Sequence, residues 1–265
     1  MNLRRSARWL MAALLIALCV WAAQRAARLG WASYQTMEAR ALLHQWIARP
    51  GPIDQQAWHR VHGSFLTALE WDPENPVYHE GFADLYLVRL PNASSGNRAL
   101  MRPYLELALR HYAKAAALRP TWPYTQAGIA SVKWQLGDLD AGFRHAIVQA
   151  SRYGPWESAV HERLIAVGYL GWAALGATER EAIGGNVQRA HQYRPRETAA
   201  LLAKLKAVAP PCSELRVEVP GACAAAASGT GAGTGAGTGA ARNGGIRNPA
   251  PSQAPSQAAG SAAAR

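Results

Sequence analysis

The chain has 265 residues, a formal net charge of +11, and 24 arginines but only 4 lysines. The arginines are scattered and interleaved with acidic residues, and no run is longer than Arg4-Arg5. A nucleic-acid-binding protein would gather such charge into one patch or stripe. The composition therefore indicates a solvated, arginine-rich surface, and we expect no nucleic-acid partner.

An apolar stretch lies near the start of the chain. Three arginines precede fifteen uncharged residues, 9–23, with Trp9 and Trp21 near the two ends of the stretch. Fifteen residues is short of the ~20 that usually span a bilayer, so a cleaved signal sequence is the alternative. Interfacial tryptophans favour an anchor, and the best cleavage candidate, residues 20–22, lacks the small-x-small pattern. We predict an uncleaved membrane anchor over 9–23.

The charges that flank this stretch predict its orientation. The arginines within residues 1–8 and the amino terminus outweigh Arg25 and Arg28 on the other side. Basic residues favour the cytoplasmic side of a span. We therefore expect residues 1–8 in the cytoplasm and the chain beyond residue 24 on the far side of the inner membrane.

Residues 24–209 are predicted to form an all-α domain. Their apolar residues recur at spacings of three and four, as at Tyr78, Phe82 and Leu85, and do not alternate with period two. Helical residues run without a break over 24–48. Further along, each helical run ends near a proline and another begins at once, as in "ALEWDPENPVYHE" from residue 68.

The residues before these prolines have the spacing of a tetratricopeptide unit, a 34-residue pair of helices. Small residues and an aromatic precede Pro120 by 5, 8 and 12 residues, and Pro73 is preceded in nearly the same way, with Val61 in place of an alanine. The predicted repeat positions are Phe65, Ala68, Pro73, Ala108, Tyr112, Ala115, Pro120, Gly137, Asp138 and Pro155.

Each of these positions has an expected role. Small residues, including Gly142, let helices approach closely, and the aromatics at 65 and 112 fill the space between helix pairs. Gly137-Asp138 forms the turn within the third pair, whose closing Pro155 comes one residue late and whose aromatic is replaced by Ala146. Residues 89–101 are extra and predict a loop, and residues 156–208 stay helical without the spacing. An irregular helical bundle is the alternative.

Two segments follow the helical domain. Residues 210–223 contain Cys212 and Cys223, which close a disulfide in an oxidising compartment or remain as two free thiols. Residues 224–265 consist almost wholly of small and polar residues and cannot bury enough apolar surface to fold. We predict a disordered low-complexity tail.

No pattern typical of a catalytic centre, a metal site or a cofactor site is found. His59 and His62 share a helical face, but no third ligand follows at a useful spacing, so we interpret them as surface histidines. "HERLI" begins like a zinc-protease helix, yet Ile165 stands where the second histidine is needed. Asp138 is interpreted as a helix cap. We expect no enzyme activity, no metal and no cofactor.

What remains is a binding groove. In tetratricopeptide-like pairs the first helix of each pair lines the inner groove, and carrying those positions over gives a predicted set of groove residues: Glu80, Asp84, Tyr124, Ser131, Trp134 and Gln135. Two carboxylates and exposed aromatics suit a basic peptide segment, or a sugar chain stacked on the rings. The alternative for Trp134 is a core position.

The order of these segments resembles one known family. An N-terminal span is followed by "ALEWDPENPVYHE", "ALRPTWPYT", "LGDLDAGFRHA", "GPWESAV" and a cysteine-bearing end. This order resembles the VpsP-type proteins of bacterial exopolysaccharide loci, over roughly residues 1–223. The resemblance implies a single-pass protein of the bacterial inner membrane, with a periplasmic domain that binds protein partners of a polysaccharide assembly or export complex.

Two other functions stay open. One is an adaptor in another envelope process, such as secretion or cytochrome maturation. The other is an enzyme that acts on envelope polymers. The oligomeric state is not predicted.

Overall fold

In the computed structural model the described residues are 3–90 and 98–205, and every regular element within these two stretches is helical. The elements are α1 (Leu3–Gln35), α2 (Met37–Ala48), α3 (Gln55–Trp71), α4 (Pro76–Arg89), α5 (Arg98–Leu118), α6 (Pro123–Leu136), α7 (Ala141–Tyr153), α8 (Ser158–Leu170), the short 3-10 helix η2 (Trp172–Ala174), α9 (Ala177–Tyr193) and α10 (Pro195–Leu205). The all-α prediction is confirmed for this part of the chain. The predicted cysteine segment 210–223, with Cys212 and Cys223, and the tail 224–265 lie outside it.

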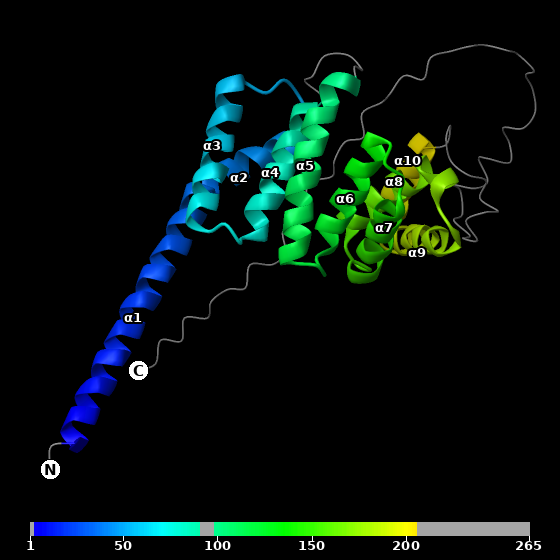
Figure 1. The fold of residues 1–265 in the computed structure, drawn as a ribbon. Coiled ribbons are helices and arrows are strands. Elements are labelled where there is room, and N and C mark those ends of the chain that lie inside the picture. Colours follow the sequence, from blue (N-terminus) through cyan, green and yellow to red (C-terminus); the bar gives the residue numbers. More distant parts are fainter. Residues whose placement is uncertain (1–2, 91–97, 206–265) are drawn as a thin grey trace, which may run out of the picture.

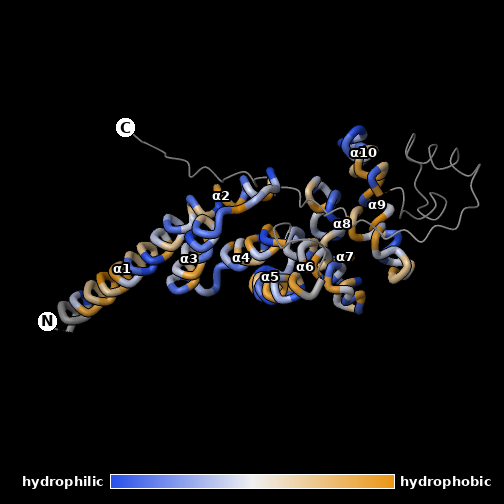
Figure 2. The backbone as a smooth tube through the Cα atoms, turned by 90° about the horizontal axis from the view of Figure 1, so that it is seen from above, coloured by the Kyte–Doolittle hydropathy of each residue, from blue (hydrophilic) through white to orange (hydrophobic). Residues whose placement is uncertain are grey.

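Helix α1 projects away from the other helices, and only its C-terminal end packs against them (Figure 1). Its 33 residues span about 50 Å at 1.5 Å per residue. From residue 8 to residue 31 the side chains are exposed apart from the half-buried Ala12, with Trp9 at 76 % and Leu14 at 72 %, and burial begins at Ala32. Figure 2 shows the apolar character of this free part. Helix α1 is therefore long and apolar enough to span a membrane, and it contains all of the predicted anchor 9–23.

The helix continues from the anchor into the domain with one interruption. The predicted unbroken helix over 24–48 is wrong at Thr36, where α1 ends and α2 begins. Thr36 is buried, and its hydroxyl donates to the carbonyls of Ala32 and Ser33, at 3.4 and 3.1 Å. A side chain that bonds the preceding turn of its own helix commonly bends it.

The prolines end and start helices as predicted. Pro73, Pro120 and Pro155 each lie two residues beyond the end of a helix, namely α3, α5 and α7. Pro76 and Pro123 occupy the first turns of α4 and α6, where a missing backbone N–H leaves no hydrogen bond unmade. Proline therefore serves both to stop one helix and to begin the next.

A side chain closes each of these three junctions in the same way. The ring nitrogen Nε2 of His79 bonds the carbonyl of Pro73 at 3.1 Å, and Nε2 of His161 bonds the carbonyl of Pro155 at 2.9 Å. The side-chain amide of Gln126 donates to the third carbonyl, that of Pro120, at 3.3 Å. Each donor lies six residues after its proline, so one junction geometry recurs three times along the chain.

The predicted aromatic positions fill the space between successive helix pairs. Phe65 of α3 packs against Gly81 of α4, where an added Cβ would come within 2.4 Å of the ring. Tyr112 of α5 packs in the same way against Gly128 of α6, at 2.6 Å. Both aromatics are at most 2 % exposed, and the predicted alanines at 68, 108 and 115 are fully buried. These positions are therefore buried, and the two rings lie where a neighbouring helix comes close.

Three local predictions are wrong. Gly142 is exposed, and a Cβ there would meet only two polar side chains, so it does not bring helices together. The cap of α7 is Asp140, which accepts from the N–H of Phe143 at 2.8 Å; Asp138 instead donates its backbone N–H to the end of α6. His62 is not a surface histidine, because its ring lies 5.0 Å from the ring of Trp58.

The two remaining expectations for this region hold in part. Gly137 forms the turn between α6 and α7 with a φ of +83°, a conformation that glycine adopts at little cost. The predicted loop 89–101 is shorter than expected, since α5 already begins at Arg98 and residues 91–97 lie outside the described part. Within the predicted helical stretch 156–208, the structure has α8, η2, α9 and α10 with short breaks between them, and residues 206–208 lie outside the described part.

The buried side chains form two clusters along the chain. One joins α1 to α5 with Val132 of α6, and the other joins α6 to α10. The clusters meet where α5 packs on α6, and Ile129 of α6 packs against both. A pocket lies at this boundary.

Candidate functional site

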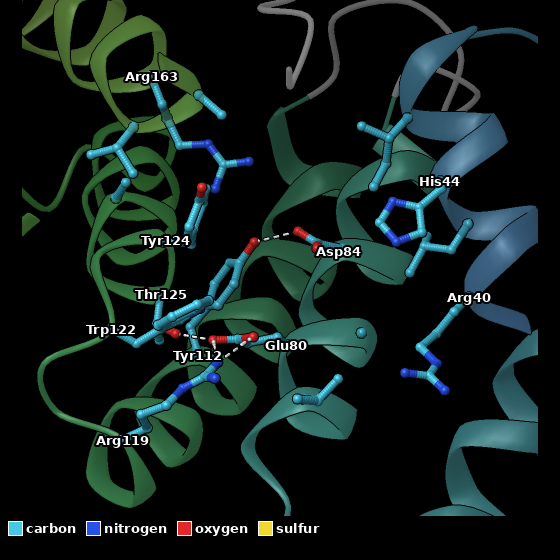
Figure 3. Close-up of a pocket in the computed structure, with 17 residues that line it drawn as sticks. Arg40, His44, Glu80, Asp84, Tyr112, Arg119, Trp122, Tyr124, Thr125 and Arg163 are labelled. Carbon is cyan, nitrogen blue, oxygen red and sulfur yellow. Dashed lines mark hydrogen bonds and ion pairs between the residues drawn. The ribbon is translucent and has the colours of Figure 1, made fainter. Parts of the chain in front are cut away.

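The pocket has a volume of about 390 Å³ and is lined mainly by alternate helices (Figure 3). Helices α2, α4, α6 and α8 supply most of its walls, α5 adds Tyr112, and the connection between α5 and α6 adds Arg119 and Trp122. The polar and aromatic lining residues are Arg40, His44, Glu80, Asp84, Tyr112, Arg119, Trp122, Tyr124, Thr125 and Arg163. The volume falls in the range of small-ligand sites, about 300–1,000 Å³.

Three of the six predicted groove residues lie together at this pocket: Glu80, Asp84 and Tyr124. The other three lie elsewhere on α6. Ser131 is buried at 2 % exposure, and Trp134 packs against the apolar cluster of α6 to α10, which is the core position weighed as its alternative. Gln135 does not line the pocket.

The carboxylate of Glu80 is already bonded within the protein. One guanidinium nitrogen of Arg119 lies 3.0 and 2.9 Å from its two oxygens, and the hydroxyl of Thr125 donates to one of them. Burial raises the pKa of Glu80, and these two donors partly oppose the shift by stabilising the anion. Glu80 therefore ties α4 to the end of α5 and to α6.

The carboxylate of Asp84 is also engaged. The phenol of Tyr112 donates to its Oδ1 at 2.5 Å, and this bond joins α4 to α5 at the pocket. Burial raises the pKa of Asp84, and the positive charge of Arg163 opposes the shift. Burial, followed by the neighbouring Asp84, holds the pKa of Tyr112 well above its usual value. Tyr112 thus serves both as the inter-pair aromatic and as a donor to Asp84.

The aromatic rings at the rim have partners as well. The guanidinium of Arg119 lies 3.9 Å from the ring centre of Trp122, and the Trp122 and Tyr124 rings lie 5.3 Å apart. The phenol of Tyr124 donates to Glu157. The rings are therefore held in place by neighbours, and the phenol of Tyr124 is used within the protein.

Cations on two opposite walls complete the pocket. Arg163 of α8 points into it from the side of Tyr124, and Arg40 and His44 of α2 lie across from it (Figure 3). Arg163 makes no hydrogen bond or ion pair with any described residue, and its Nε atom is buried without a partner. Arg40 makes only contacts of 3.4 to 3.5 Å, to Ser33 and Thr36.

The sequence analysis missed these three basic residues. The first-helix rule was applied to α4 and α6 alone. Carried to α8, the seven-residue offset of Glu80 from Pro73 gives Glu162, whereas Arg163 follows Pro155 by eight residues. The rule would have pointed to α8 as a lining helix, but not to Arg163 itself.

The residues that the structure describes contain no group of three or more His, Cys, Asp and Glu side chains placed to hold a metal ion. His79 and His111 do approach each other, with their Nδ1 atoms 3.2 Å apart. The Nε2 of His79 is taken by the carbonyl of Pro73, so this pair serves packing between α4 and α5.

Comparison of the chain with protein-family models, with curated proteins and with solved structures gives no match.

Proposed function

We propose that this chain is a membrane-anchored helical-repeat protein that binds partner proteins and thereby supports exopolysaccharide biosynthesis or export. In this proposal α1 anchors the chain in the inner membrane, and α2 to α9 form tetratricopeptide-like pairs on the periplasmic side. Partners bind at the face made by the first helix of each pair.

One observation carries the proposal: α2, α4, α6 and α8, four alternate helices, converge on a single pocket. In a tetratricopeptide-like array the first helices share the concave face, and such faces are binding surfaces. A bundle with unrelated helix packing would have no reason to place every second helix around one cavity.

The junctions support the repeat assignment independently. Pro120 and Pro155 are 35 residues apart, which agrees with the 34-residue unit. Pro73 and Pro120 are 47 residues apart, and the longer interval contains the connection between α4 and α5 and the 21-residue helix α5. At each of the three prolines, a side chain six residues later bonds the proline carbonyl, so each interval begins with the same local structure.

The exopolysaccharide assignment rests on the sequence resemblance, and the envelope location on α1. Because α1 continues to Ala32 before the first buried contact, only about nine residues separate the predicted anchor from the domain. At 1.5 Å per residue that is ~14 Å of helix. The pocket is then held near the bilayer surface, where membrane-embedded partners are within reach.

Site-specific photo-crosslinking in intact cells tests this function. A benzophenone amino acid is placed at Trp122, on the pocket rim, and as a control at the exposed Leu66 of α3. We expect specific crosslinks from the rim position to glycosyltransferases or to chain-length or export proteins, and none of these from position 66.

Polymer output gives the second readout. A chain lacking partner binding should make less surface polysaccharide, and higher expression should partly restore it through mass action. Rim crosslinks that reach only secretion or cytochrome-maturation proteins would move the function to the alternative envelope process. A loss of polymer that no level of expression relieves, with the crosslinks intact, would indicate catalysis.

A further inference from the structure

The pocket was expected to suit a basic segment because it contains two carboxylates. The structure shows that both are bonded to residues of this chain: Glu80 to Arg119 and Thr125, and Asp84 to Tyr112. A basic ligand would have to displace these bonds. Breaking a buried, charge-assisted bond is costly because it leaves a buried polar or charged group without a partner.

The groups that remain available in the pocket are cationic. The guanidinium of Arg163 has five potential donors, makes no hydrogen bond with any described residue, and keeps a buried Nε atom without an acceptor. A buried polar atom without a partner costs free energy that a ligand can recover. Arg40 and His44 face it from the other wall, and three lining arginines stand against two lining carboxylates.

We propose that this pocket binds an acidic segment of a partner protein, with a side-chain carboxylate of the partner held by Arg163. The inference rests on the proposed function and names the chemistry of its partner. The planar guanidinium donates two parallel hydrogen bonds to a carboxylate, which fixes the orientation of the carboxylate and strengthens binding. Arg40, on the facing wall, meets a second acidic group of the same segment.

The internal bonds of the pocket make the proposal testable in two directions. Glu80→Gln removes the anion that holds Arg119, so one more cation becomes available and an acidic ligand should bind more tightly. Arg163→Gln removes the free fork, so the same ligand should bind more weakly. A misfolded variant would bind more weakly, so tighter binding by Glu80→Gln cannot result from loss of folding.

The experiment measures fluorescence anisotropy of labelled hexaglutamate with the full chain in neutral detergent micelles at about 0.1 M salt. Hexaglutamine and hexalysine are the uncharged and opposite-charge probes. Of the three probes, we expect only hexaglutamate to bind. Its Kd should be about tenfold higher for Arg163→Gln, intermediate for Arg163→Lys, and about threefold lower for Glu80→Gln than for the wild type. Arg60→Gln, on the exposed face of α3, changes net charge equally outside the pocket and should leave the Kd unchanged.

Several outcomes would overturn the proposal. If hexalysine bound more tightly than hexaglutamate, or if Glu80→Gln bound hexaglutamate more weakly than the wild type, the pocket would suit a basic ligand instead. If Arg60→Gln and Arg163→Gln lost equal affinity for hexaglutamate, the binding would depend only on the overall charge of the protein. Binding of oligogalacturonate but not hexaglutamate, dependent on Arg163, would assign an acidic polysaccharide instead. If hexaglutamate does not bind while the crosslinks from position 122 persist, the acidic-segment proposal is wrong and the proposed function is unaffected.

Discussion

Replacing Gly128 with alanine should destabilise the domain, although alanine is the better helix former. A Cβ at this position would lie 2.6, 2.8 and 2.9 Å from three ring atoms of Tyr112. The ring cannot move aside, because it is 2 % exposed and its phenol is bonded to Asp84. Overpacking a tight core costs typically 1–3 kcal/mol, and a rigid ring places this case at about 3 kcal/mol.

The helix preference of alanine over glycine returns about 1 kcal/mol, which leaves a net loss of roughly 2 kcal/mol. For a domain of this size a loss of 1 kcal/mol lowers the melting temperature by roughly 2–4 °C. We therefore expect Gly128→Ala to melt about 4–8 °C below the wild type, measured by circular dichroism of the full chain in detergent.

A second glycine provides the matched control. Gly63 lies within α3, and nothing lies within 4 Å of its added Cβ. Gly63→Ala should therefore show the helix preference alone and melt a few degrees higher than the wild type. If Gly128→Ala melted at or above the wild-type temperature, the close packing of α5 on α6 through Tyr112 would be refuted.

The sequence was sufficient for features that depend on neighbours a few residues apart. The prolines located the ends of α3, α5 and α7, because proline acts on its own turn of the chain. The positions of Phe65 and Tyr112 followed from their distance to those prolines. The error at Gly142 has the opposite cause: a glycine can serve a close approach only if another helix reaches it, and the sequence does not state which one does.

The pocket chemistry could not be predicted because its bonds join distant parts of the chain. Glu80 is bonded to Arg119 and Thr125, which follow it by 39 and 45 residues, and Asp84 to Tyr112, 28 residues on. The sequence pattern placed the two carboxylates on the inner helix face, but it could not show that residues far along the chain bond to them. Because both carboxylates are bonded within the chain, the arginines are the groups that the pocket offers to a ligand.

Two further predictions concern the histidines. His161→Ala leaves the carbonyl of Pro155 without its donor and should cost about 2 kcal/mol in denaturant unfolding, whereas His161→Gln should stay near wild type, because Gln126 makes the equivalent bond. The other prediction is a pH dependence at His111, whose pKa is lowered from 6.5 to about 4 by burial and then by the neighbouring His79. The unfolded chain binds this proton more readily than the folded one, so the contribution of His111 to stability is present above pH 6.5 and is lost as pH falls toward 4. Between pH 7 and 4.5 the melting temperature of the wild type should therefore fall further than that of His111→Gln, which cannot take up the proton. Equal falls for the two proteins would show that His111 is protonated at no cost in the folded state, and that its burial between α4 and α5 does not limit stability in acid.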